Sequence, residues 1–388
     1  MTVEQILEKL VSFPVLGGES NLEIIHWIQS YINSYDIKTT LVPNADGNKA
    51  SLHCRIGPAS DGGVILSGHT DVVPVDGQEW TSDPFILTEK GDGKLYGRGA
   101  CDMKGFLATC LAALPEMVKA ELIKPIYFAF SYDEEIGCLA APELAQCILS
   151  HYTETPKYAI IGEPSSLEPI IGQKGIYILE TYVNGTAGHS SRIRQEVSAI
   201  HEAARLVLWL EEKMNRLIEA GRLDDRFHPP HTSLHIGLFN GGIAPNVIAN
   251  KASFYWDVRA IPMDDVSEIR DEFEAHCRQR ETELRSIFPQ FKIETVENHP
   301  PVPPLDTRED TDVVELIKRL SGNSKLNTVA FAAEAGQFAE AGFQSVICGP
   351  GSIAQAHRAD EFIAIDQLHK GVAFLHRLIK ELSSSNFS

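Results

Sequence analysis

The chain has 388 residues, of which 43% are hydrophobic, and its formal net charge is −19. This length suits two domains with sizeable cores, and the apolar content argues against a disordered chain. The excess of acids argues against nucleic acid and anionic membranes as partners, because phosphate binding needs clustered Lys and Arg, whereas a cationic substrate is compatible with it.

The N-terminus and the cysteines bear on location. Residues 1–10 (MTVEQILEKL) carry acids and predict an amphipathic helix rather than a signal peptide. The seven cysteines include no C-x-x-C pair, so they predict reduced thiols rather than a disulfide framework or a zinc ribbon. No apolar run approaches the roughly 20 residues that span a bilayer. We therefore expect a cytoplasmic protein.

In the first half of the chain, short apolar runs alternate with helical patterns. The apolar runs predict buried strands at residues 64–68, 126–132 and 158–162. Helices are expected at 103–118 and 141–149. This alternation indicates an α/β sheet with helices on both faces.

The pattern changes near residue 174, where a second kind of domain is expected. The order of its elements is β-α-β-β-α-β, which is the split ferredoxin-like arrangement. The expected elements are a strand at 177–183, a helix at 197–217, strands at 232–238 and 252–261, a helix at 266–288 and a strand at 292–297.

A Pro-rich segment at residues 300–304 predicts a linker back to the first domain. After it, α/β alternation resumes, with a helix at 312–320, strands at 328–331 and 345–348, and a helix at 366–382. We therefore expect a discontinuous α/β domain, residues 1–175 and 299–388, in which helices flank a sheet. A smaller ferredoxin-like α+β domain, residues 176–298, is inserted into it.

Acidic residues and a histidine follow three of the predicted strands directly. His69 and Asp71 follow the first, residues 133–135 (Asp-Glu-Glu) follow the second, and Glu163 follows the third. In open α/β sheets, ligands bind beyond the carboxyl ends of the strands. Each residue alone is more simply read as a hydrogen-bonded polar group. Together they predict a site at one edge of the sheet.

Two Gly-rich turns contribute further candidates. Asp102 lies at the centre of GRGACDMKG, and His357 ends the loop GPGSIAQAH after the strand at 345–348. The alternative for Asp102 is an N-capping residue of the following helix, and the alternative for His357 is an incidental loop histidine.

Six ordered motifs make the sequence similar to the zinc-dependent acyl-amino-acid deacylase and carboxypeptidase family. The resemblance covers nearly the whole chain and implies a hydrolase-like catalytic domain, an inserted lid that also forms a homodimer, and a small N-acyl amino acid as substrate. The motifs are SGHTDVVPV (67–75), LYGRGACDMKG (95–105), DEEIG (133–137), IIGEPS (160–165), GHSS (188–191) and GPGSIAQAH (349–357).

The resemblance implies two zinc ions per subunit. One zinc would take His69 and Glu163, the other would take Glu135 and His357, and Asp102 would bridge them. Zinc accepts imidazole nitrogen and carboxylate oxygen, and two close metals can share one carboxylate and one hydroxide. Cobalt or manganese would accept similar ligands.

Three more residues receive catalytic roles from the resemblance. Asp71 would hold the imidazole of His69 in the right tautomer. Glu134 would be the general base that passes a proton from water to the leaving nitrogen. His189 would stabilise the oxyanion, reaching in from the partner subunit's lid. The alternative for His189 is a surface histidine at a strand end.

Four residues are candidates for substrate binding. Arg259 could clamp an α-carboxylate, with a salt bridge within the lid as the alternative, and Lys174 is a second candidate for that carboxylate. Asn246 lies at a family position for polar groups of the substrate. Glu334 could receive a substrate ammonium, although Ala333 stands where similar enzymes usually have Thr, which leaves the substrate open.

Within the family, the motifs most resemble the acetylornithine deacetylase group. Succinyl-diaminopimelate desuccinylase and other N-acyl amino acid deacylases are the alternatives, because their metal centre would be the same. A non-catalytic, metal-dependent binding protein is the alternative of another class. The presence of Glu134 favours an enzyme, since a scaffold needs no general base.

Overall fold

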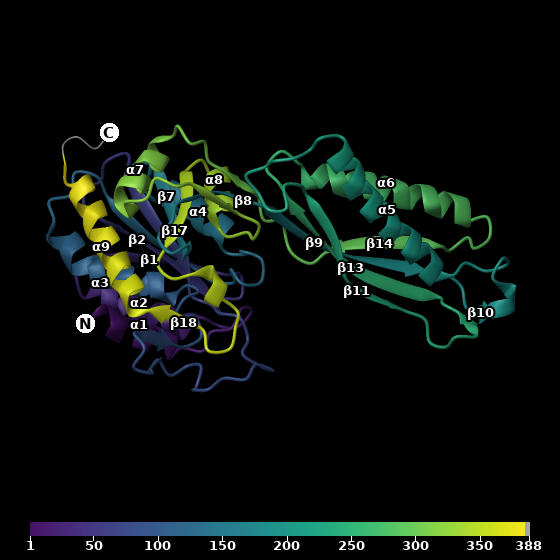
Figure 1. Cartoon of the computed structure of the whole chain (residues 1–388), viewed down its shortest axis with the longest axis horizontal. Helices are drawn as coiled ribbons and strands as arrows, with labels where there is room; N and C mark the ends of the chain where they lie inside the picture. The colour runs from purple at the N-terminus through teal and green to yellow at the C-terminus, as the bar shows by residue number, and fades with distance from the viewer. Residues whose placement is uncertain (385–388) are drawn as a thin grey trace. The chain divides into compact units, whose positions relative to one another are not determined.

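The computed structural model describes residues 1–384, and the chain divides into two compact units (Figure 1). Unit 1 comprises Met1–Gly172, Leu305–Thr328 and the described residues from Ala333 onward. Unit 2 comprises Gln173–Pro304 and Val329–Ala332. The domain boundaries expected at 175/176 and 298/299 stay predictions.

A mixed sheet forms the centre of unit 1. Its strand order is β1-β2-β6-β3-β7-β17-β8-β15, and β16 pairs with β8. The four central strands run parallel, because β3 pairs in parallel with β6 and β7, and β7 with β17. Their carboxyl ends therefore meet at one edge. The strands are β1 Thr39–Pro43, β2 Ala50–Ile56, β3 Val64–His69, β6 Ile126–Ser131, β7 Tyr158–Pro164, β8 Ile170–Gln173, β15 Leu305–Asp306, β16 Asn327–Val329 and β17 Gln344–Gly349.

Helices cover both faces of this sheet (Figure 1). On one face, α1 and α9 pack against α3, and α2 adds its apolar side chains to the same core as Leu52 and Cys54 of β2. On the other face, α4 contacts α8, and Tyr152 after α4 bonds to His53 of β2. The helices are α1 Val3–Val11, α2 Leu22–Asn33, α3 Lys104–Lys119, α4 Ala141–His151, α7 Asp312–Ser321, α8 Ala335–Glu340 and α9 Ile365–Leu382.

Local sequence explains these elements. All six residues of β3 (VILSGH) are buried, as a central strand covered on both faces requires. Helix α1 begins with a capping box, in which Thr2 accepts a bond from the Gln5 backbone and the Gln5 side chain accepts from Thr2. A small sheet of β4 (Thr88–Glu89), β5 (Lys94–Tyr96) and β18 (Phe362–Ala364) brings the segment after residue 357 beside the segment before residue 102.

Unit 2 is a four-stranded antiparallel sheet with two helices. The strand order β11-β13-β9-β14 and the sequence order of the elements are those of the ferredoxin-like fold, as expected. Alternate residues of β13, including Phe254, Trp256 and Val258, are buried in the core with side chains of both helices. The elements are β9 Gly175–Asn184, β10 Gly188–His189, α5 Ala199–Glu219, β11 Ser233–Gly241, β12 Val247–Ile248, β13 Lys251–Ala260, α6 Val266–Leu284 and β14 Lys292–Glu297, with short 3-10 turns at Ser190–Arg192 and Ile353–Gln355.

The α/β class with an inserted α+β domain is confirmed, and the differences concern the limits of expected elements and several elements that were not expected. Helix α6 ends at Leu284 rather than at 288, and β16 ends at Val329 rather than at 331. Strands β1 and β2 and helix α2 were not expected from the sequence. Alternation of apolar and polar residues does not predict β2 (ASLHCRI), because its polar His53 is buried beside apolar neighbours.

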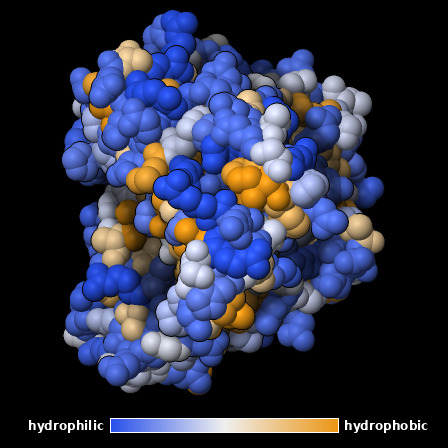
Figure 2. Space-filling view, turned by 90° about the vertical axis from the view of Figure 1, so that its right-hand side faces the viewer, coloured by the Kyte–Doolittle hydropathy of each residue, from blue (hydrophilic) through white to orange (hydrophobic). Residues whose placement is uncertain are grey.

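The face of the molecule drawn in Figure 2 is mainly hydrophilic, with apolar patches. Figure 2 shows such patches on the side of the molecule drawn at the right of Figure 1. The exposed large apolar side chains of unit 2 include Leu238 and Phe239 of β11 and Ile243 after it. Among residues 1–384, no helix is both long enough and apolar enough to cross a membrane.

Candidate metal centre

The carboxyl ends of three parallel strands carry the first group of candidate residues. β3 ends at His69, β7 contains Glu163 near its end, and β6 ends two residues before the turn at 133–135. Asp133 adopts φ 56°, in the left-handed region that Asp tolerates better than most residues. The chain thus turns sharply at Asp133, directly before Glu134 and Glu135.

Asp102 lies between two histidines. Its Oδ1 is 3.3 Å from Nε2 of His69, and its Oδ2 is 3.3 Å from Nε2 of His357. The same nitrogen of His357 is 3.1 Å from Oε2 of Glu135. The two oxygens of one carboxylate therefore face two different imidazoles.

The carboxylates of Glu134 and Glu163 lie on the His69 side. Nε2 of His69 is 3.7 Å from Oε1 of Glu163 and 3.9 Å from Oε2 of Glu134. Ligand atoms of His69, Asp102 and Glu135 lie within 4.8 Å of one another, and so do those of His69, Glu134 and Glu163. The structure thus brings together all five predicted metal ligands and the predicted base.

Asp71 contacts this cluster in two ways. Its backbone carbonyl lies 2.8 Å from Nδ1 of His69, and its Oδ1 lies 3.6 Å from the same nitrogen. Hydrogen bonding to this carbonyl favours a proton on Nδ1 and leaves Nε2 as the nitrogen that could bind a metal. The Asp71 carboxylate itself accepts from the backbone N–H groups of Glu134 and Glu135, at 3.2 and 3.1 Å. It therefore seats the turn that carries both glutamates.

Electrostatics favour a cation at this place. Burial raises the pKa of Glu134 and Glu163, and the neighbouring carboxylates raise it further. Burial would lower the pKa of His69, but bonding to Asp102 and Asp71 raises it well above its ordinary value. Bonds to Asp102 and Glu135 raise the pKa of His357 to about 10. These shifts come from burial and from carboxylates held close together, and a bound cation would stabilise the ionised form of those carboxylates.

The donor set fits two divalent metal ions. The cluster contains four carboxylates, those of Asp102, Glu134, Glu135 and Glu163. Within residues 1–384, their ion pairs are all with His69 or His357, so no Lys or Arg neutralises them. Oε1 of Glu163 is buried without a hydrogen-bond partner. Imidazole nitrogen and carboxylate oxygen are ligands that Zn²⁺ accepts, and Co²⁺ or Mn²⁺ binds similar sets.

Glu334 lies close to the same cluster, at the start of α8. Its Oε2 accepts from the Ser67 hydroxyl at 3.2 Å, whereas its Oε1 is buried without a partner. Burial raises the pKa of Glu334. One more buried acceptor without a partner, Oε1 of Gln337, lies one helical turn later. These acceptors could receive a donor such as an ammonium group.

The other four predicted residues lie in unit 2. His189 and Asn246 are neighbours there, because β10 pairs with β12 and the Ser190 backbone donates to the Asn246 carbonyl at 3.1 Å. Both side chains are exposed.

Arg259 and Lys174 differ in their exposure and in their hydrogen-bond partners within unit 2. The Nε of Arg259 donates to Asp257 at 2.7 Å, and its side chain is 35% exposed. Lys174 is fully buried, and its ammonium donates to the His231 carbonyl at 2.7 Å.

Lys49, which was not predicted, contacts a turn that carries candidate ligands. Lys49 pairs with Asp133, at the turn before Glu134. A single Lys between two strands gives no local signal, and its partner is 84 residues away. Pairing of this kind is visible only in the folded structure.

Comparison with known proteins shows that the chain is similar to one peptidase family and to several named enzymes. The peptidase family M20/M25/M40 matches residues 65–381. An acetylornithine deacetylase from Proteus mirabilis is 33% identical over 374 residues, 93% of this chain and 92% of that protein. An acetylornithine deacetylase from Photorhabdus laumondii is 32% identical, covering 98% and 97%. A tripeptidase from Staphylococcus aureus has the same fold, with a TM-score of 0.77 at 19% identity and 98% coverage of both chains.

Proposed function

Because the chain belongs to the peptidase family M20/M25/M40 and is a metal-dependent amidohydrolase, we propose that it removes the acetyl group from N2-acetyl-L-ornithine. The products would be acetate and L-ornithine, which assigns the enzyme to arginine biosynthesis. The substrate is proposed because full-length relatives at 30 to 33% identity carry the name acetylornithine deacetylase.

The observation that carries the proposed chemistry is the position of Asp102. Each of its oxygens faces one histidine, and each histidine has further carboxylates beside it. This arrangement suits two cations that share one carboxylate, with His69 and Glu163 on one side and Glu135 and His357 on the other. We propose Zn²⁺ for both positions, with Co²⁺ or Mn²⁺ as substitutes.

Two such cations would polarise the scissile carbonyl and lower the pKa of a water molecule between them. Glu134 lies beside these ligands, and its Oε1 accepts from the thiol of Cys138 at 3.4 Å. We propose that Glu134 takes a proton from the attacking water and delivers it to the leaving nitrogen. Asp71 keeps Glu134 in place by accepting its backbone N–H.

Residues of unit 2 would complete the site. We propose that His189 donates a hydrogen bond to the developing oxyanion from the partner subunit, and that Asn246 beside it contacts the substrate. For the α-carboxylate we assign Arg259 in preference to Lys174, whose ammonium is buried and bonded to a carbonyl. Glu334, with one unpartnered oxygen, would receive the side-chain ammonium of ornithine.

We propose a homodimer that forms through unit 2. β11 lies at an edge of its sheet and exposes Leu238 and Phe239. An exposed edge strand with apolar side chains is suited to pairing with a second copy. The seven described cysteines are free thiols, which favours a reducing compartment, and we propose the cytoplasm.

The test is a hydrolysis assay on metal-stripped protein with Zn²⁺, Co²⁺ or Mn²⁺ added back. The panel contains N2-acetyl-L-ornithine, N-succinyl-diaminopimelate and acetylated amino acids with neutral side chains. We expect the highest kcat/KM for N2-acetyl-L-ornithine, because its side chain ends in an ammonium alone. The side chain of N-succinyl-diaminopimelate carries a carboxylate beside its ammonium, and Glu334 would repel that carboxylate. A higher value for the succinyl substrate would show that the substrate assignment is wrong.

A further inference from the structure

A buried carboxylate outside the ligand set holds the turn that carries Asp102. Glu361 is 1% exposed and lies four residues after His357. Its Oε1 accepts from the backbone N–H groups of Cys101 and Asp102, at 2.9 and 3.0 Å. Its Oε2 accepts from the backbone N–H of Gly99 at 3.1 Å and from Nη1 of Arg98 at 2.8 Å.

These four bonds leave Glu361 no free position for another ligand. A carboxylate offers about four lone-pair sites, and here all four have donors. Three of the donors are main-chain N–H groups of the turn at 99–102, and one of these three is the N–H of Asp102 itself. The position of Glu361 therefore sets the backbone position of Asp102.

The network continues to the other side of the centre. Arg98 is fully buried, and its Nη2 donates to the side-chain oxygen of Gln78 at 2.6 Å. The Gln78 amide in turn donates to the backbone carbonyl of His357 at 2.9 Å. One connected set of hydrogen bonds thus reaches both Asp102 and His357. These residues are far apart in sequence, but Oδ2 of Asp102 lies 3.3 Å from Nε2 of His357.

We infer that Glu361 is a positioning residue of the metal centre. It fixes the turn at 99–102 so that one oxygen of Asp102 faces His69 and the other faces His357. The inference rests on the two-metal site proposed above. Because Asp102 would serve both metals, loss of this support weakens both metal positions together, whereas loss of a ligand such as Glu163 or Glu135 weakens one more than the other.

The test measures Co²⁺ binding to metal-free protein by visible absorption, which reports on coordination directly and needs no turnover. Glu361→Gln removes the charge and turns one acceptor into a donor that faces main-chain N–H groups. Glu361→Asp keeps the charge but withdraws both oxygens by roughly one bond length, about 1.5 Å. We expect both variants to bind each of two Co²⁺ ions about 10- to 100-fold more weakly than the parent.

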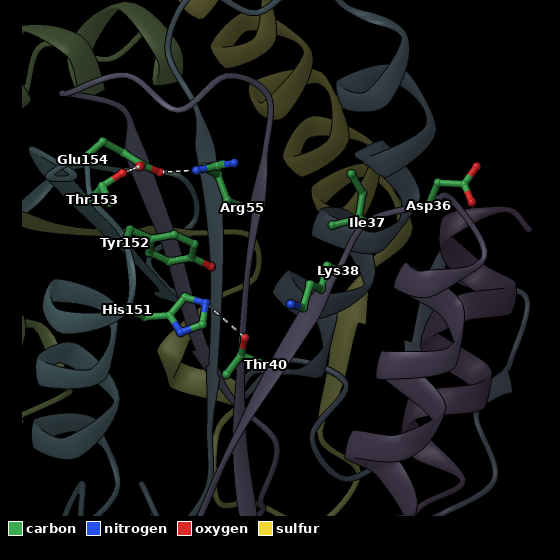
Figure 3. A pocket seen from close by; sticks show the side chains of 9 residues that line it. All are labelled: Asp36, Ile37, Lys38, Thr40, Arg55, His151, Tyr152, Thr153 and Glu154. Atoms are coloured by element: carbon green, nitrogen blue, oxygen red, sulfur yellow. Dashed lines mark hydrogen bonds and ion pairs between the residues drawn. The ribbon is translucent and has the colours of Figure 1, made fainter.

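Glu154 provides a matched control. It is also a buried glutamate of unit 1, and it accepts from Nη1 of Arg55 at 2.6 Å and from the Thr153 hydroxyl at 3.1 Å (Figure 3). It accepts from the Tyr127 hydroxyl as well, at 3.1 Å. None of these partners belongs to a turn that carries a predicted ligand. Glu154→Gln is expected to lower the thermal stability of the metal-free protein and to leave both Co²⁺ affinities at the parental value.

Glu361→Asp decides the matter if Glu361→Gln does not fold. Parental Co²⁺ affinity in the folded Asp variant, even with lower stability, would overturn the inference, since Glu361 would then act on the fold alone. A parent that binds two Co²⁺ ions and a variant that binds them weakly would support it, even if no N-acyl amino acid were hydrolysed. That last result would contradict only the proposed function.

Discussion

Lys49 and Asp133 form an ion pair inside unit 1, with Nζ 2.5 Å from Oδ2 and with side chains that are 10% and 6% exposed. The other oxygen of Asp133 accepts from the Gly18 backbone at 2.8 Å. Asp133 is the residue at which the chain turns into the metal centre, because Glu134 and Glu135 follow it. The pair therefore holds a backbone position on which two proposed functional residues depend.

Lys49→Met is expected to destabilise the protein strongly. The substitution leaves the Asp133 carboxylate buried without its cation, which costs about 3 kcal/mol or more of unfolding free energy. Urea unfolding of the metal-free protein measures this loss. The control is Lys157→Met, which removes an exposed pair with Asp312 at 2.7 Å and should cost less than about 1 kcal/mol. Equal losses in the two variants would contradict the role assigned to Lys49.

Glu134→Gln and Glu135→Gln are expected to fail for different reasons. Glu134→Gln removes the proposed base, so kcat should fall by about 10²- to 10⁴-fold while both metals stay bound. Glu135→Gln removes a proposed ligand beside His357, so the bound metal should fall toward one ion per subunit. Metal content by mass spectrometry, together with kcat, separates the two. A Glu134→Gln variant with parental turnover would refute the proposed proton transfer.

The origin of His189 can be tested by mixing inactive variants. His189→Ala and Glu134→Gln homodimers should each have little activity. If His189 acts on the partner subunit, a hybrid dimer contains one complete site, made of Glu134 from one subunit and His189 from the other. Unfolding and refolding the two variants together should then restore about a quarter of the parental activity, from half of the dimers with one site each. No recovery in verified hybrids would place His189 in its own subunit's site.

His53 is expected to make the protein less stable in acid. It is fully buried, its ring bonds to Tyr152, and it lies close to Cys147 and His151. His151 and Tyr152 line the cavity of about 420 Å³ in Figure 3. Burial, aided by His151, lowers the pKa of His53 to about 4. Between pH 6.5 and pH 4 the unfolded chain therefore binds a proton that the folded chain does not, and stability falls as pH falls.

The unfolding free energy lost in this way amounts to about 3 kcal/mol near pH 4. We expect the unfolding free energy of His53→Gln to decrease less between pH 7 and pH 4 than that of the parent, whatever its value at pH 7. The control is His26→Gln, at an exposed position of α2, which should keep the parental pH dependence. Parallel curves for the parent and His53→Gln would rule out this explanation.

Part of the candidate cluster was predictable because His69, Glu135 and Glu163 follow parallel strands or lie at their ends. His69 and Glu163 lie at the ends of neighbouring strands, and a rule about sheet edges is enough to bring them together. Asp102 and His357 lie on loops, whose paths no periodicity describes. Their place in the centre came from the family resemblance, and their roles as ligands stay predictions.

The residues that support the ligands could not be predicted. Lys49 and Glu361 are single charged residues without a repeated pattern around them, and their partners lie far away in sequence. A charged residue in a sequence predicts an exposed position, because burying a charge is unfavourable unless the fold places a partner beside it. His189, Asn246, Arg259 and Lys174 lie in unit 2, where their roles toward substrate remain predictions.

The insertion of unit 2 into unit 1 determines when the metal centre can form during synthesis. A ribosome adds Asp102 and Glu135 early, then all of unit 2, and only afterwards His357 and Glu361. At about 5 to 20 residues per second, the stretch from Asp102 to His357 takes roughly 13 to 50 s. For most of that time, once Glu163 has been added, the nascent chain carries the acidic half of the centre without its second histidine. Metal capture is therefore a late event, which follows the synthesis of nearly the whole chain.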